Sequence, residues 1–320
     1  METVIIEGLS FALPLFIIAI GGIYSERSGI TNLALEGLLG FGAFTGALSV
    51  TVFSKFGGTA SPRMLFLMTL IFAVIGGMIY SMLHALLCIK FKANQVISGV
   101  VVNILAMALT AFLTSQLNDI LFGKPSNKFL LDVCERFSIP GLSSIPVIGA
   151  FFKDLYIFVP IILVVALIAW YVMYKTRYGL RLRACGDNPH AVDAAGADVS
   201  RIRFVAVMVS GALAGLGGIC FAYSITASFS PSIYAGYGYL AIAALIFGNW
   251  RIMPTLGACL LFGFARSGGY KLAQLLQLPS AFSDLIMILP YLLTLLLLIF
   301  FSSSNRAPRA LGEIYDKGKR

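Results

Sequence analysis

Long apolar runs recur along the whole chain, most of them close to twenty residues, and short polar stretches separate them. An α-helix needs about 20 predominantly apolar residues to cross the hydrocarbon core of a bilayer. The pattern therefore predicts an all-α integral membrane protein, a polytopic bundle of about 8–10 transmembrane helices. We expect spans at residues 4–22, 34–54, 64–89, 95–121, 156–174, 202–225, 237–249, 253–268 and 283–302.

The composition agrees with a membrane-embedded chain. Of 320 residues, 59% are hydrophobic and 12% are charged, and the mean hydropathy is +0.92, whereas soluble chains carry about 25% charged residues. The first run contains Glu7 and lacks a basic region before it, which favours a retained span over a cleaved signal peptide. With no second globular domain in the pattern, residues 1–320 are predicted to form a single transmembrane domain.

The two spans between residues 237 and 268 are short and are interrupted by Asn249, Arg251 and Pro254. Short, interrupted segments often surround a translocation path, because protein or water can satisfy their non-helical backbone. Two tilted helices joined by a tight hairpin would give the same pattern. The sequence leaves both interpretations open.

Most basic residues gather on one side if the loop at 174–204 is placed in the cytoplasm and the spans alternate from there. This arrangement leaves the N-terminus outside, with Lys55 and Arg63 against the trend in a short outer loop. The positive-inside rule expects such a bias. This bias explains the net charge of +9 better than binding to nucleic acid would. It also makes membrane lipids the expected contact of the basic residues. The inside set holds 15 of the 23 Lys and Arg: Arg27, Lys90, Lys92, six in 174–204, Arg251, Arg306, Arg309, Lys317, Lys319 and Arg320.

Small residues mark positions where helices can approach closely. Gly211 and Gly215 form a GxxxG pair in the sixth span. Such glycines let helix backbones pack tightly in lipid. The second span offers a similar series, at Gly37, Gly40, Gly42 and Gly46.

The sequence offers no catalytic constellation. It has two histidines, His84 and His190, and five scattered cysteines without a CxxC pair, so neither a nucleophilic triad nor a metal site is expected. Gly123-Lys124 lacks the upstream glycine and the following Ser or Thr of a P-loop. We predict a transport subunit that binds no cofactor, rather than an integral-membrane enzyme. Few ionisable residues lie deep in the spans, which weighs against a secondary carrier or channel.

Uncharged polar residues and one acidic residue are predicted to form a polar path through the spans. Amides and aromatic side chains suit a neutral solute that carries hydroxyl groups or a ring. Taken one at a time, the amides can instead make interhelical hydrogen bonds, and the cluster of Tyr234, Tyr237 and Tyr239 can belong to an interfacial aromatic belt. The candidate residues for the translocation path are Asn32, Glu36, Asn94, Gln95, Asn103 and Tyr237.

The basic loop at 175–201 is predicted to hold a short helix of about two turns. Asp187 or Asn188 can cap its start, Pro189 suits its first turn, and Gly196 fits the position just after its end. Its apolar side chains are small, so a partner protein can approach closely. The loop can therefore dock a soluble subunit, or simply contact lipid headgroups.

Three separated stretches resemble permeases of ATP-binding-cassette (ABC) importers, in the branch for simple sugars, branched-chain amino acids and nucleosides. They are "RACGDNPHAVDAAGADVSRIRFVAVMVSGALAGLGG", "GGIYSERSGITNLALEGLLGFGAF" and "FKANQVISGVVVNILA". The second is similar to the corresponding stretch of the nucleoside-permease group. Sugar permeases carry a different motif at this position. The resemblance thus implies nucleosides as substrate, with riboflavin or a simple sugar as alternatives.

The resemblance also implies partners and a coupling site. In the family, an ATPase subunit that holds ATP and Mg²⁺ receives the docking loop. A second permease subunit, related but not identical, and an external substrate-binding protein or lipoprotein complete the importer. We expect it in a bacterial cytoplasmic membrane, with residues 303–320 as a cytoplasmic tail. The coupling residues implied are Gly186, Asp187, Asn188, Pro189, His190, Ala194, Ala195 and Gly196.

Overall fold

The computed structural model describes residues 2–57, 60–131, 134–141, 143, 148–232, 234, 236–277, 279, 281–301 and 306–317. Position 302 of the last predicted span and residues 303–305 and 318–320 of the predicted tail lie outside the described residues.

Each of the nine predicted spans coincides with a helix. Six of the described helices are long and apolar enough to cross a membrane, and α9 is a shorter apolar helix of 11 residues. The prediction of an all-α polytopic membrane protein is confirmed. The helices are α1 (Glu2–Arg27), α2 (Leu35–Phe56), α3 (Pro62–Ala85, continued by the π-helical turn η1, Leu86–Lys90), α4 (Gln95–Phe122), α5 (Phe158–Lys175), α8 (Val199–Ile225), α9 (Tyr237–Phe247), α10 (Ile252–Leu275) and α11 (Ala281–Phe301).

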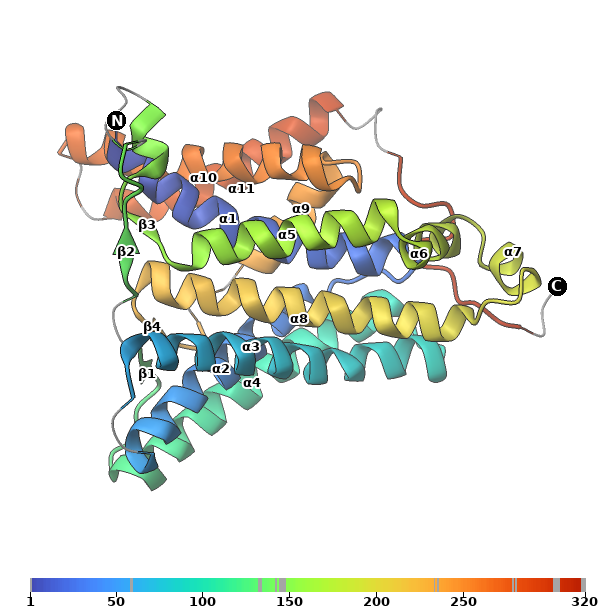
Figure 1. The fold of residues 1–320 in the computed structure, drawn as a ribbon, viewed down its shortest axis with the longest axis horizontal. Helices are drawn as coiled ribbons and strands as arrows, with labels where there is room; N and C mark the ends of the chain where they lie inside the picture. Colours follow the sequence, from blue (N-terminus) through green and yellow to red (C-terminus); the bar gives the residue numbers. More distant parts are fainter. Residues whose placement is uncertain are drawn as a thin grey trace.

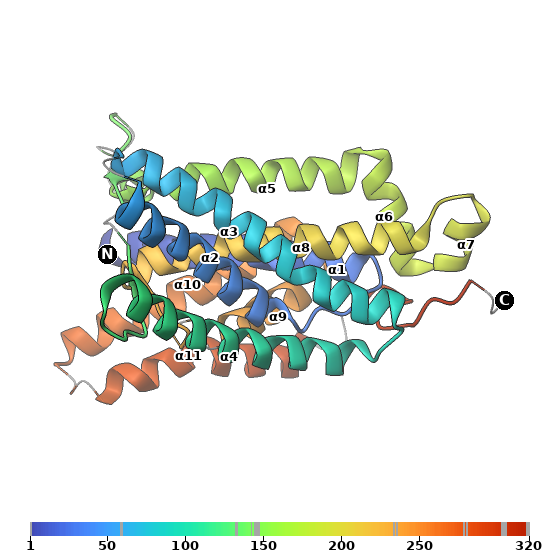
Figure 2. The same ribbon diagram turned by 90° about the horizontal axis from the view of Figure 1, so that it is seen from below.

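Helices α1 and α8 lie at the centre of the bundle and are buried along most of their length. Helices α2 and α3 pack against α8 on one side, and α9 and α10 pack against α1 on the other. Figures 1 and 2 show the long helices running lengthwise, with the N-terminus at one end and α7 (Pro189–Ala194) and the C-terminus at the other. We call these the N-terminal end and the tail end.

Glycines allow the central helices to touch, as the sequence predicted. A Cβ atom built on Gly215 of α8 would lie 2.2 Å from the Ala73 carbonyl oxygen of α3, and one on Gly42 of α2 would lie 2.3 Å from the Gly215 Cα. At Gly211 the nearest atom would be the Gly77 carbonyl oxygen, at 2.3 Å. Close backbone packing of this kind takes the place of the hydrophobic driving force that lipid removes.

Two short strand pairs close the N-terminal end. Strand β1 (Phe129–Leu130) pairs with β4 (Ser228–Phe229), and β2 (Arg136–Phe137) pairs with β3 (Leu155–Tyr156), both antiparallel. A short 3₁₀-helix, η2 (Ile148–Phe152), lies between β2 and β3 in the chain.

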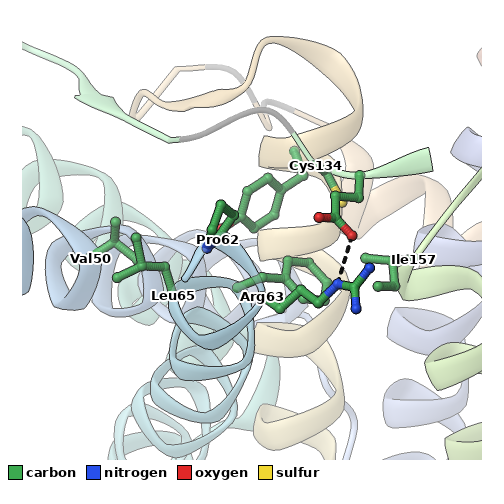
Figure 3. A pocket seen from close by; sticks show the side chains of 9 residues that line it. Val50, Pro62, Arg63, Leu65, Cys134 and Ile157 are labelled. Atoms are coloured by element: carbon green, nitrogen blue, oxygen red, sulfur yellow. Dashed lines mark hydrogen bonds and ion pairs between the residues drawn. The ribbon is translucent and has the colours of Figure 1, made fainter. Parts of the chain in front are cut away.

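An ion pair joins the start of α3 to the long segment between α4 and α5. Arg63 Nε lies 3.0 Å from a Glu135 carboxylate oxygen. Both side chains line a small cavity of about 20 Å³, together with Cys134 (Figure 3). Because both side chains are largely exposed, the pair contributes little stability. It places residue 63 and the long segment at one end, as alternating spans require.

The connection between α5 and α8 at the tail end contains two helices, α6 (Arg177–Asp187) and α7. The short helix predicted after Asn188 is α7, whereas α6 was read as part of the loop. The Thr176 hydroxyl caps α6 by accepting the Gly179 N–H at 3.2 Å, and the Leu182 and Cys185 side chains of α6 are buried. Asp198 caps α8 by accepting the Arg201 N–H.

Candidate functional site

Helix α9 begins beside an acidic side chain from another helix. The Glu36 carboxyl group accepts the Gly236 N–H on Oε1 and the Gly238 N–H on Oε2, each at 2.6 Å. These are two of the backbone donors that the first turn of a helix leaves without intrahelical partners. A carboxyl group is also favoured there by the positive end of the helix dipole. Gly236 has φ +98°, a conformation that glycine adopts readily.

This start lies well inside the bundle. Asn103 is eight residues into α4, which is about 12 Å along a helix, and its amide donates to the Tyr239 hydroxyl at 3.0 Å. The 11 residues of α9 span about 16 Å, roughly half of a bilayer core. A turn at residues 248–251 then leads into α10. The interrupted pattern therefore reflects the short helix α9 and a tight hairpin, whereas α10, with 24 residues, is longer than the sequence predicted.

The Asn103 side chain joins three segments. Its Oδ1 accepts the Gly37 N–H at 2.7 Å, and its Nδ2 donates to the Leu33 carbonyl at 2.7 Å as well as to Tyr239. The amide thus uses both donors and one acceptor on protein groups. Asn103 holds the start of α2 against α4 and orients Tyr239, which makes it a positioning residue.

A cavity of about 240 Å³ lies against this junction. Tyr239 is 45% exposed, and its hydroxyl accepts the Asn103 bond, so among the described residues its own proton has no acceptor and can serve a ligand. The Tyr234 hydroxyl is buried and has no hydrogen-bond partner among the described residues. Ile104 and Met107 of α4, which contribute to the lining of the cavity, have exposed side chains. Its lining comprises Glu36, Gly37, Gly40, Asn103, Ile104, Ala106, Met107, Thr110, Pro231, Tyr234, Gly236 and Tyr239.

Of the six predicted path residues, Glu36 and Asn103 line this cavity and the other four lie elsewhere. Asn32 is fully buried and donates to the Ser210 hydroxyl at 2.7 Å. Gln95 accepts the N–H of Thr31, and Asn94 is the exposed cap of α4.

Tyr237 is buried behind the cavity. Arg266 Nη2 donates to its hydroxyl at 3.5 Å, and its ring packs against Phe11 and Phe221. Tyr239, which does line the cavity, was not among the predicted path residues. Its only sequence signal was membership of the tyrosine cluster, since periodicity alone does not tell which residue of a short helix faces a cavity.

Helix α7 presents small side chains at the surface of the tail end. The Asn188 Oδ1 accepts the Ala191 N–H at 3.1 Å, Pro189 opens the helix, and Gly196 has φ +79° just beyond it. Pro189 and Val192 are buried against the bundle. The exposed side consists of His190, Ala191, Ala194, Ala195 and Gly196.

The residues just before α7 are divided between surface and interior. Asp187 is exposed, whereas Gly186 is buried and a Cβ on it would lie 2.3 Å from the Arg27 carbonyl oxygen. Cys185 is buried too, and burial raises the pKa of its thiol to about 11. Gly186 and Cys185 are therefore packed inside the tail end and are not part of the exposed surface of α7. Among the described residues, no group of three or more His, Cys, Asp and Glu is placed to hold a metal ion.

Comparison with known families decides what kind of bundle this is. The family described as "Branched-chain amino acid transport system / permease component" matches residues 4–298, a range that includes all or most of every described helix. The chain belongs to this permease family. The permease is accordingly a multi-pass membrane protein, and its resemblance to ABC importer permeases is confirmed.

Known relatives match the permease over almost its whole length. It is 40% identical to the guanosine ABC transporter permease protein NupQ of Bacillus subtilis, over 98% of this chain and 96% of the relative. It is 35% identical to the nucleoside ABC transporter permease protein NupC of Lactococcus lactis, over 100% and 98%. A second guanosine permease protein of B. subtilis, NupP, is 27% identical, over 92% and 80%. No solved structure matches the chain.

Proposed function

We propose that the permease carries nucleosides through a bacterial cytoplasmic membrane as one membrane subunit of an ATP-driven importer. The observation that carries the proposal is the match to NupQ, at 40% identity over nearly the full length of both chains. The match to NupC, also named for nucleosides, supports the same substrate class.

The chemistry of the cavity fits a neutral solute with a ring and hydroxyl groups. Tyr239 offers an aromatic ring and an accessible hydroxyl group, while the Glu36 oxygens are already bonded to backbone N–H groups. A nucleoside has an apolar ring face and several uncharged donors and acceptors. We assign substrate contact to Tyr239, and a positioning role to Glu36 and Asn103.

The cavity is open and small, which supports a second permease subunit. Ligand sites usually enclose about 300–1,000 Å³, whereas this cavity holds about 240 Å³, and its lining includes the exposed apolar side chains of Ile104 and Met107. A second subunit against α4 would enlarge the site and cover that surface. The similarity to both NupQ and NupP of one organism supports a related, non-identical partner.

The exposed face of α7 is the proposed docking site for the ATPase subunit, which would hold ATP and Mg²⁺ and carry out hydrolysis. An external binding protein or lipoprotein would deliver the nucleoside at the N-terminal end. ATP binding would bring the two ATPase subunits together and draw the two α7 helices with them. Rigid-body rocking of the packed helices would then change the side to which the cavity opens.

A deletion strain tests the substrate class. Cells lacking the permease gene, and the same cells complemented with it, would be given labelled guanosine, adenosine, uridine, riboflavin and glucose separately. We expect complementation to restore uptake of one or more nucleosides and to leave riboflavin and glucose unchanged. Restoration of riboflavin or glucose uptake alone would overturn the nucleoside assignment.

A further inference from the structure

The last described segment, residues 306–317, folds back across the tail end and touches all four turns there. We call it the C-terminal strap. The Ala310 N–H donates to the Gly186 carbonyl at 2.8 Å, and the Gly312 N–H donates to the Gly29 carbonyl at 3.1 Å. The strap thus bonds the end of α6, directly before α7, to the turn between α1 and α2.

Other contacts tie the strap to the remaining turns. The Arg306 N–H donates to Asn249 Oδ1 in the α9–α10 turn at 2.6 Å, and Asp316 pairs with Lys92, after α3, at 3.0 Å. The Tyr315 ring lies 5.3 Å from that of His190 on α7. These outer contacts are partly exposed and contribute less than the buried backbone bonds.

A buried arginine fixes the middle of the strap. Arg203 of α8 is 2% exposed, and its guanidinium donates to the Ser28 carbonyl at 3.0 Å and to the Glu313 carbonyl at 3.1 Å. A buried guanidinium needs hydrogen-bond acceptors to offset its lost hydration. The strap supplies one of these acceptors, so its position is built into the packing of the bundle.

A short stretch of chain connects the strap to the cavity. Gly29 accepts the strap, Thr31 donates to the Gln95 side chain at 2.7 Å, and Leu33 accepts from Asn103 in the cavity wall. The contact with the strap and the contact with the cavity wall are therefore four residues apart in sequence.

We propose that the C-terminal strap is a positioning segment that makes α7 move as one body with residues 29–33, and so links the ATPase to the cavity. The proposal rests on the proposed function in one respect, since it takes α7 as the ATPase-docking helix. It adds a role for a segment that does not line the cavity and that contacts α7 at His190 and Asp193.

The decisive variant is Ala310→Pro in the full-length permease, which removes the N–H that bonds Gly186. Its matched control is Glu313→Ala, because Glu313 meets Arg203 through its carbonyl oxygen and its side chain is exposed. In proteoliposomes holding the complete importer, we expect Ala310→Pro to keep ATPase binding and to lower nucleoside uptake per ATP hydrolysed by about fivefold or more. An uptake-to-hydrolysis ratio equal to that of the control would overturn the proposal.

Hydrogen exchange provides a second measurement that needs no substrate. In the purified permease–ATPase complex, amides at residues 29–33 should exchange about tenfold faster in Ala310→Pro than in Glu313→Ala, with α1 amides unchanged. Equal exchange at residues 29–33 in the two variants would also overturn the proposed positioning role of the strap. If the intact importer carries no nucleoside, the proposed function fails, and the exchange result still decides the role of the strap.

Discussion

Glu36 and Gly238 are 202 residues apart in sequence, and Glu36 Oε2 accepts the Gly238 N–H at 2.6 Å in the middle of the bundle. A Cβ on Gly238 would lie 2.4 Å from the Glu36 backbone nitrogen, so the two backbones approach as closely as a glycine allows. The start of α2 and the start of α9 consequently form one unit. This contact joins α9 to the start of α2, which follows residues 29–33 in the chain.

Replacing Glu36 by Ala should impair uptake while the permease still inserts in the membrane. Two helix N–H groups would lose their acceptor, and each buried donor left unpaired costs about 1–3 kcal/mol. We expect uptake to fall by about tenfold or more, since 1.4 kcal/mol corresponds to a factor of ten. Glu36→Gln, which keeps one acceptor oxygen, should lose less. The control is Glu7→Gln at an exposed position of α1; equal uptake for Glu36→Ala and this control would contradict the role.

Replacing Asn103 by Leu should also reduce uptake without preventing assembly with the ATPase. The change leaves the Gly37 N–H and the Leu33 carbonyl without their partner, and each unpaired buried group costs about 1–3 kcal/mol. Gln116→Leu is the matched control, because it changes an exposed amide on the same helix. Uptake kinetics and co-purification of the ATPase would be measured together. Normal kinetics in Asn103→Leu would show that its contacts do not support transport.

Replacing Tyr239 by Phe should weaken substrate binding with little effect on stability. The variant keeps the ring and removes the hydroxyl that the cavity exposes, and one hydrogen bond to a neutral group is worth about 0.5–1.5 kcal/mol. We expect KM for the nucleoside to rise by about three- to tenfold, with the melting temperature of the permease nearly unchanged. Tyr171→Phe, on the exposed side of α5, is the control. A KM equal to that of the control would remove Tyr239 from the substrate site.

Much of the fold was predictable because lipid imposes a strong pattern. All nine apolar runs coincide with helices, six of which are long and apolar enough to cross a membrane, and the start of α7 was predicted at Asp187 or Asn188, of which Asn188 is the cap. Helix α6 was missed because its sequence is polar and basic, and what holds it is burial of Leu182 and Cys185 by the rest of the chain. A pattern at the level of one helix does not show such tertiary burial.

The site was only partly predictable for a related reason. Glu36 and Asn103 were chosen as polar residues within apolar runs, and both line the cavity, but Asn32 and Gln95 satisfied the same criterion and bond neighbouring segments instead. Glu36 and Asn103 line the cavity because they lie beside the start of α9. The contacts that place α9 there join residues that are 136 to 202 positions apart in sequence. The strap was not predicted either, because its main bonds are made by backbone groups that have no sequence signature.

The glycine contacts at the centre of the bundle predict a stability difference between two otherwise similar changes. Gly215→Ala places a methyl group 2.2 Å from the Ala73 carbonyl oxygen, whereas Gly257→Ala on α10 has no atom within 4 Å. Overpacking typically costs about 1–3 kcal/mol, and Gly→Ala in an unobstructed helix gains about 0.5–1 kcal/mol. The melting temperature in detergent should fall for Gly215→Ala and hold or rise for Gly257→Ala. A fall for both, or for neither, would contradict the packing.

We propose that ATPase docking at α7 drives nucleoside transport through this bundle. The most direct test is the initial rate of labelled guanosine uptake into proteoliposomes that hold the complete importer, with and without ATP on the side of α7. We predict ATP-dependent uptake that is lost in Ala195→Arg, since a large charged side chain replaces a small exposed one, and is kept in Ser200→Arg, which adds the same side chain just outside α7. Uptake that needs no ATP, or that Ala195→Arg leaves intact, would contradict the account.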